Sequence, residues 1–250
     1  MENQGMENQG MENQGSENQS MENEEKQIKV QAADGERLLS EAETRRYRNL
    51  LQKQAELESR GYVRRDRIIS LMKANTVGTL AILPFVAVVV ALYLIRNGMN
   101  FYPSAVGERY GAFTVVWGIG TFVVMFGCFV VHELIHGFFW SFGAQNHWKD
   151  IEFGFIAQML TPYCTCLSPL KKPFYILGSM MPMTLLGIVT GIVAIFTGNP
   201  FILLFSVIHI MGGAGDMLIT CMILKDKVKG KDVLIFDHPY ECGYILFERK

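Results

Sequence analysis

The sequence predicts an all-α membrane protein with about four transmembrane helices, a disordered N-terminal tail, an amphipathic cytoplasmic helix and a small C-terminal β-hairpin. Two observations carry this prediction. Long uncharged apolar runs fill the chain from Val77 to Leu224, although its mean hydropathy is only +0.19. Lysines and arginines gather outside these runs, as expected where charged side chains are expensive to place in hydrocarbon.

The first segment, residues 1–35, is expected to be disordered. Residues 1–25 are five copies of a pentad, the first three of which read Met-Glu-Asn-Gln-Gly. Such a repeat cannot bury enough apolar surface to offset the entropy of ordering the chain. Residues 1–27 also contain no apolar core of a cleavable signal peptide, so the first hydrophobic run is expected to direct membrane insertion.

A charged cytoplasmic segment, residues 36–75, is expected to be helical, mainly over Glu36–Arg60. Arg46 and Gln54 interrupt its apolar stripe and its charges alternate in sign. This pattern favours a solvated or membrane-surface helix over a coiled coil. The basic stretch Tyr62–Lys73 then lies directly before the first apolar run, which indicates a cytoplasmic N-terminal side.

Four candidate spans make up a transmembrane domain over residues 76–225. Each approaches the length of about 20 apolar residues that a bilayer requires. Because the second is long for one crossing, we expect tilt or a helix break near Gly118 or Gly120. The spans are approximately Val77–Ile95, Phe113–Phe142, Phe174–Phe196 and Phe201–Leu224.

The distribution of basic residues predicts the topology. They lie on the N-terminal flank, in the loop between the second and third spans, and in the tail over residues 226–250. An even number of spans puts these three regions on one side of the membrane. We therefore expect a multi-pass cell-membrane protein with both termini cytoplasmic.

The second span carries His132, Glu133 and His136 near its predicted inner end. Histidines four residues apart project from one face of a helix, and two imidazoles at this spacing can bind one Zn²⁺. A glutamate beside the first can serve as a base toward water that the metal activates. This motif also occurs by chance in soluble helices, where its residues simply pack. Within an apolar span, however, ionisable groups need partners, which favours a metal site.

A third ligand is required, since catalytic zinc usually has three protein ligands. The histidine pair lies roughly 10–16 Å from the inner end of its span. Asp216 has a matching depth in the fourth span, and it is the only carboxylate inside any of the other spans. The small residues of Gly212–Gly215 permit close helix approach or local unwinding beside it.

Other potential ligands are weaker candidates. His209 shares the helix face of Asp216 but lies about 10 Å deeper along a straight helix, which leaves it as a neighbour of the ligands, a substrate contact or a packed histidine. His238 is expected in a turn. The five cysteines form no obvious disulfide framework, and Cys164 and Cys166 lack a second cysteine pair nearby, so reduced structural thiols are expected. A net charge of −1 gives no bulk attraction to nucleic acid.

Two stretches outside the spans favour strands. Ile151–Ile156 alternates apolar and other residues, and its edge could pair with an unwound substrate segment; an ordinary cytoplasmic loop is the equal alternative. In the tail, Val233–Phe236 and Tyr244–Phe247 flank turn residues, which predicts the hairpin.

The sequence from His132 to His136, followed by Asp216 in a later helix, resembles the site-2-protease class of intramembrane zinc metallopeptidases. About Val77–Glu248 is also similar to a bacterial membrane family described as zincin peptidases, including the Asp237-His238-Pro239 stretch. The resemblance implies zinc as cofactor, with His132, His136 and Asp216 as ligands and Glu133 as catalytic base. Site-2 proteases typically carry Asn-Pro before the ligand aspartate, whereas Ala214-Gly215 stands here.

These observations predict an HExxH-type zinc metalloprotease that hydrolyses peptide bonds of membrane proteins near the cytoplasmic side. Its expected partners are a membrane-embedded protein substrate and the lipid bilayer. The alternative is a non-catalytic membrane protein, for metal binding or transport, that uses the same ligands; a scaffold without turnover is a third possibility. Glu133 discriminates among them, because only a protease needs it as a base.

Overall fold

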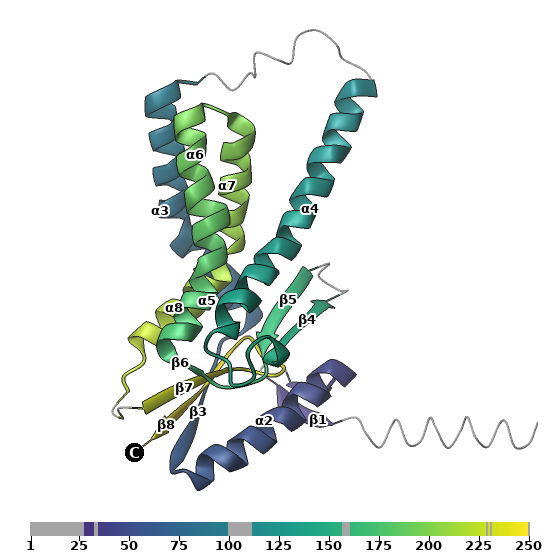
Figure 1. Ribbon diagram of the computed structural model, residues 1–250, viewed down its shortest axis with the longest axis vertical. Coiled ribbons are helices and arrows are strands. Elements are labelled where there is room, and N and C mark those ends of the chain that lie inside the picture. The colour runs from purple at the N-terminus through teal and green to yellow at the C-terminus, as the bar shows by residue number, and fades with distance from the viewer. Residues whose placement is uncertain are drawn as a thin grey trace, which may run out of the picture.

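The computed structural model describes residues 28–32, 35–99, 112–156, 161–228, 230 and 232–249. The pentad repeats, predicted to be disordered, lie outside these residues. The described part consists of apolar helices that stand on a small sheet, with one charged helix beneath the sheet (Figure 1).

The apolar helices follow the predicted order. They are α3 (Leu71–Asn97), α4 (Ala112–Ser141), the continuous run of α5 (Lys172–Pro182), η3 (Met183–Val189) and α6 (Thr190–Thr197), and the pair α7 (Pro200–Gly212) and α8 (Ala214–Lys225). In the described chain, three helices are long and apolar enough to cross a membrane, and the pair α7–α8 makes four if it is one span. The four predicted apolar segments are thus helical, while the number of spans and membrane insertion stay predictions.

The helix break lies in the fourth span and not in the second. α4 runs without interruption through Gly118 and Gly120, so the break expected there is absent. Instead, α7 and α8 meet at an angle of 44° around Gly213. A Cβ atom on Gly213 would lie 2.7 Å from the Cβ of Met183, so only glycine lets the bend pack this closely against η3.

The third apolar helix contains a π-helical stretch, η3, which alters the hydrogen-bond spacing of its backbone. Ser206 of α7 is fully buried and its hydroxyl donates a hydrogen bond of 2.7 Å to the carbonyl of Gly187 in η3. This bond provides a polar link between two apolar helices.

Strands outside the apolar helices correct the prediction of an all-α fold. The C-terminal hairpin of β7 (Asp232–Asp237) and β8 (Gly243–Arg249) forms as predicted. It is also the centre of an antiparallel sheet with the order β3-β8-β7-β6. Of the flanking strands, β3 (Tyr62–Ile68) lies in the segment expected to be helical, and β6 (Leu170–Lys171) immediately precedes α5.

Both faces of the central hairpin are buried, because successive side chains of a strand point to opposite sides. Ile235 and Leu246 belong to a cluster with residues of α4, α5 and α8. Phe236, Ile245 and Phe247 pack on the opposite side against α2. This two-sided burial explains why the hairpin strands contain apolar runs without polar alternation.

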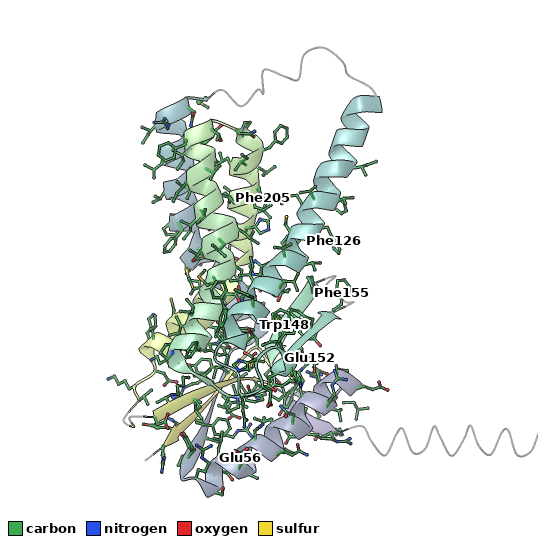
Figure 2. The ribbon with its side chains drawn as sticks, in the orientation of Figure 1. Glu56, Phe126, Trp148, Glu152, Phe155 and Phe205 are labelled. Atoms are coloured by element: carbon green, nitrogen blue, oxygen red, sulfur yellow. The ribbon has the colours of Figure 1, made fainter. Side chains whose placement is uncertain are left out.

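The predicted charged helix forms as α2 (Glu41–Ser59), which begins later than predicted. The residues before it form a hairpin of β1 (Lys29–Ala32) and β2 (Gly35–Leu38), so β1 corrects the prediction of disorder up to residue 35, and β2 replaces the expected start of the helix. Ser40 and Glu43 form a capping box at its start, which explains where the helix begins. Figure 2 shows nitrogen and oxygen atoms gathered around α2 and the sheet, while carbon dominates the side chains of α3, α6 and α7.

The segment between α4 and α5 is a second hairpin. After a short 3-10 helix, η1 (His147–Asp150), β4 (Ile151–Ile156) pairs antiparallel with β5 (Thr161–Cys166). The strand predicted from alternation is therefore present. The hairpin lies beside the base of α4 (Figure 1), with Phe153 of β4 against Gly137 of α4.

Candidate metal centre

Three of the predicted site residues lie on one face of α4. His132, Glu133 and His136 each offer a ligand atom, and these atoms all lie within 4.8 Å of one another. Only 6% of His132 and 3% of His136 are exposed, whereas Glu133 is half-buried. The helical spacing thus brings the two imidazoles together, as the sequence predicts, and the carboxylate of Glu133 lies within 4.8 Å of them.

Asp216 completes this group from the first turn of α8. Its Oδ2 atom lies 3.4 Å from Nε2 of His132 and 3.4 Å from Nε2 of His136. Asp216, which the sequence puts at the same depth as the histidines, therefore contacts both of them. It lies just beyond the bend at Gly213. Of the Asp216 side chain, 29% is exposed, so the group is open on one side.

The donor set fits zinc. Two imidazole nitrogens and a carboxylate oxygen are the ligands typical of catalytic zinc sites. Two ligands bound at about 2.0–2.1 Å to one tetrahedral ion are about 3.3 Å apart, close to both distances from Asp216 to the histidines. The structure brings the four residues together, and their roles as ligands and base stay predictions.

The orientation of His136 is set by α5. Its Nδ1 atom lies 2.9 Å from the carbonyl oxygen of Gly178, so Nδ1–H donates and Nε2 keeps a lone pair directed at the site. On its other side the ring stacks on Trp140, with centroids 5.1 Å apart and planes at 22°. A Cβ on Gly178 would lie 2.1 Å from Cδ1 of Trp140, so this approach requires glycine.

Glu133 points toward the β4–β5 hairpin. The backbone amide of Cys164 on β5 interacts with its carboxylate. Among the described residues, no lysine or arginine forms an ion pair with Glu133 or Asp216. The two histidines are therefore the basic side chains paired with Asp216 among the described residues, and the group is suited to a bound cation.

His209 lies outside the ligand group. It is fully buried, its Nδ1 lies 2.9 Å from the carbonyl oxygen of Phe205, and its ring stacks against Phe205 and Phe129. These contacts fit a packed histidine, although its Nε2 is buried without a hydrogen-bond partner among the described residues, so its role stays a prediction.

The other potential ligands, His238 and the cysteines, lie outside the metal centre. His238 is buried in the turn between β7 and β8, where its Nδ1 accepts the amide of Glu241 at 3.0 Å, and burial lowers its pKa to about 4. Burial raises the pKa of the Cys166 thiol to about 12. All five cysteines are free thiols, in agreement with the prediction of reduced structural cysteines.

The sequence reasoning missed several residues around the site. Trp140, Tyr175 and Gly178 contact or support His136, and Asp237 supports Tyr175 through a hydrogen bond. One local signal was available for Trp140, which lies one helical turn after His136. Asp237 lies 62 residues after Tyr175 in the sequence, so no local pattern links it to the site.

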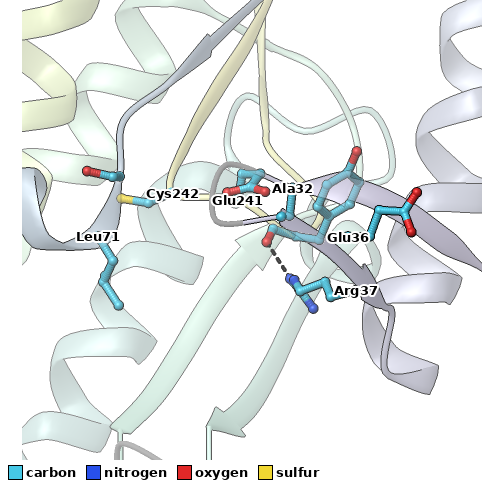
Figure 3. Close-up of a pocket in the computed structure, with 9 residues that line it drawn as sticks. Ala32, Glu36, Arg37, Leu71, Glu241 and Cys242 are labelled. Atoms are coloured by element: carbon cyan, nitrogen blue, oxygen red, sulfur yellow. Dashed lines mark hydrogen bonds between the residues drawn. The ribbon is translucent and has the colours of Figure 1, made fainter.

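A separate pocket of about 300 Å³ lies between β2, the start of α3 and the turn before β8 (Figure 3). Arg37 donates a hydrogen bond of 2.8 Å to the carbonyl of Tyr240 at its edge. None of the candidate metal ligands lines this pocket, so it plays no part in the metal centre.

Comparison with known proteins points to the same class as the site. Residues 125–229 match the model of a family described as "Putative zincin peptidase". The matched segment contains both histidines, Glu133 and Asp216, and the family description implies zinc. No curated protein and no solved structure matches the chain.

Proposed function

We propose that the protein is an intramembrane zinc metalloprotease that cleaves membrane proteins near the cytoplasmic side of the bilayer. The observation that carries the proposal is the contact of one Asp216 oxygen with Nε2 of both His132 and His136, next to Glu133. The zincin family match supports a zinc peptidase. The apolar helices that hold the residues support a location within the membrane.

In this proposal, His132, His136 and Asp216 hold the metal. When bound, zinc supplies Lewis acidity, which polarises a peptide carbonyl and makes water easier to deprotonate. Glu133 takes a proton from the attacking water and passes it to the nitrogen of the leaving amine. The hydrogen bond from His136 to Gly178 keeps the imidazole in the tautomer that can bind the metal.

The β4–β5 hairpin is the proposed place for substrate. An intramembrane protease must open a helical substrate before cleavage, and a strand edge offers backbone groups to an unwound segment. The contact between Cys164 of β5 and Glu133 supports this role, because a chain paired with the hairpin would pass close to the base.

The proposal includes a topology in which both termini are cytoplasmic. β1 and the C-terminus lie at the same end of the molecule, with α2 and the sheet (Figure 1). Together with the excess of basic residues in these regions, this arrangement supports a cytoplasmic position for both termini.

The proposal is tested by Glu133→Gln, which removes the base and keeps the shape of the side chain. We expect the purified variant to retain about one zinc per chain, as three ligands remain, and to lose cleavage of a membrane-embedded reporter. Glu58→Gln on α2 is the control and should cleave normally. Unchanged cleavage in Glu133→Gln would overturn the mechanism.

The alternative, a metal-binding or transport protein with the same ligands, makes a different prediction in the same experiment. It needs no base, so wild type would bind zinc and cleave no reporter, while Glu133→Gln would leave metal binding or flux unchanged. Zinc-free wild type, purified without chelators, would contradict both functions.

A further inference from the structure

A second buried network lies behind the metal centre and converges on Asp237, the last residue of β7. Its Oδ1 accepts the hydroxyl of Tyr175 at 2.6 Å. Its Oδ2 accepts the hydroxyl of Thr165 at 2.8 Å and the backbone amide of Cys166 at 3.1 Å. One carboxylate of the C-terminal sheet is thereby joined to α5 and to β5.

The first branch of the network leads to the ligand His136. Tyr175 is 4% exposed, and its carbonyl accepts the indole N–H of Trp140 at 3.0 Å. Trp140 stacks on one face of His136, while the carbonyl of Gly178, one helical turn after Tyr175, accepts its Nδ1–H. The first turns of α5 thus fix both the orientation and the tautomer of the His136 ring. Asp237 holds these turns in place through its hydrogen bond with the Tyr175 hydroxyl.

The second branch leads to the base. Thr165 and Cys166 of β5 donate to Asp237, and two residues earlier the amide of Cys164 interacts with the carboxylate of Glu133. A shift of β5 along its axis would therefore move the group that faces Glu133. The same aspartate supports the ligand side and the base side of the centre.

We propose that Asp237 is a positioning residue of the metal centre, which holds His136 through Tyr175 and Trp140 and holds the strand facing Glu133 through Thr165 and Cys166. The inference rests on the proposed metal site, although it concerns the C-terminal sheet and not the ligands themselves. Groups that orient a metal ligand from outside the coordination sphere typically change metal affinity by about 10–100-fold when removed.

The rival explanation is that Asp237 only joins the sheet to the helices. β7 contains a matched control for this explanation, because the carboxylate of Asp232, at the other end of the strand, accepts the hydroxyl of Tyr62 in a similar way. Within the part of the chain that the structure describes, Asp232 forms no hydrogen bond or ion pair with His132, His136 or Asp216. A purely structural role predicts similar effects for Asp237→Asn and Asp232→Asn.

The test uses the full-length protein in detergent, loaded with Co²⁺ or Zn²⁺. For Asp237→Asn we expect zinc affinity, measured by competition with a chromophoric chelator, to fall about 10–100-fold. The visible absorption bands of Co²⁺ should also shift, because the geometry at His136 changes. Asp232→Asn should keep the affinity and spectrum of wild type, even if both variants melt earlier.

Tyr175→Phe isolates the first branch, because it removes the hydroxyl and keeps the carbonyl that Trp140 uses. We expect a smaller change in the same two readouts, and this variant carries the test if Asp237→Asn does not fold. The inference would be overturned if folded Asp237→Asn kept the zinc affinity and the Co²⁺ spectrum of the wild type. If only Tyr175→Phe folds, the same result in that variant would overturn it. If the wild type binds metal but cleaves no substrate, the proposed protease function is wrong, and the metal-affinity measurements still test the role of Asp237. If the wild type binds neither Zn²⁺ nor Co²⁺, both the proposed function and the role of Asp237 are overturned.

Discussion

Carboxylates in the sheet layer and in the apolar helices have different ion-pair partners. In the sheet layer, arginine pairs with acid: Arg67 holds Asp226 with two bonds of 2.8 Å, and Arg37 holds Glu43 at 2.7 Å. In the apolar helices, the only described ion-pair partners of Asp216 are His132 and His136.

The difference shows which acids are structural. A carboxylate that has a guanidinium partner is already neutralised and contributes to folding. Two carboxylates beside two imidazoles, in a region with few other charges, are suited to a cation that arrives from outside. The comparison therefore separates the acids of the metal centre from those that a guanidinium neutralises. Asp232 and Asp237 of β7 belong to neither group, because they accept hydrogen bonds from neutral hydroxyl and amide groups.

The largest effect is expected from removing a ligand. His136→Ala and Asp216→Ala should each lower zinc from about one per chain to near zero, because two protein ligands are too few for a stable site. Metal analysis of the purified protein measures this. His147→Asn, on η1, is the control, since asparagine tolerates its φ of 54°. Normal zinc content in either alanine variant would remove that residue from the ligand set.

A core substitution in the sheet layer should destabilise the protein without emptying the metal centre. Phe247 is fully buried on the α2 side of the sheet, so Phe247→Ala should cost about 3–5 kcal/mol in unfolding free energy. Denaturant unfolding measures the loss, with Val63→Ala on β3, which is 42% exposed, as control. Zinc per folded chain should stay unchanged; parallel loss of zinc would show that the two regions are not separable.

Replacing a paired acid of the sheet layer should give a smaller, pH-dependent loss. The guanidinium of Arg67 lowers the pKa of Asp226, so the pair stabilises the fold at neutral pH, and this contribution is lost as pH falls below about 4. Asp226→Asn should cost about 1–3 kcal/mol at pH 7. The difference from wild type, followed by unfolding at decreasing pH, should shrink in acid. A difference that stays constant would exclude the ion pair as its cause.

The smallest effect is expected at the start of α2. Ser40→Ala removes one half of the capping box with Glu43 and should cost about 1 kcal/mol. Thermal unfolding measures this, and Ser40→Asp, which can still cap the helix, should restore most of it. A loss several times larger would mean that α2 supports the sheet more strongly than its exposed position suggests.

Sequence patterns predicted the parts that depend on local spacing. The four apolar segments, the strand at Ile151–Ile156 and the tail hairpin follow from residue periodicity and length. Helix depth and the rarity of carboxylates in spans predict Asp216 as a neighbour of the histidines, and its Oδ2 lies 3.4 Å from Nε2 of both. By contrast, neither the sheet formed with β3 and β6 nor the bend at Gly213 was predicted in its observed form.

Helical geometry alone puts His132 and His136 on one face of a helix with Glu133 beside the first, so this part of the site can be predicted from local spacing. The support of the site depends on contacts between segments that are distant in the chain. The bend at Gly213 beside Asp216 depends on packing against Met183, and Asp237 reaches Tyr175 because the C-terminal hairpin forms the centre of the sheet. Such contacts join residues far apart in the chain, so no local pattern specifies them, and the same tertiary contacts hold His136 in place.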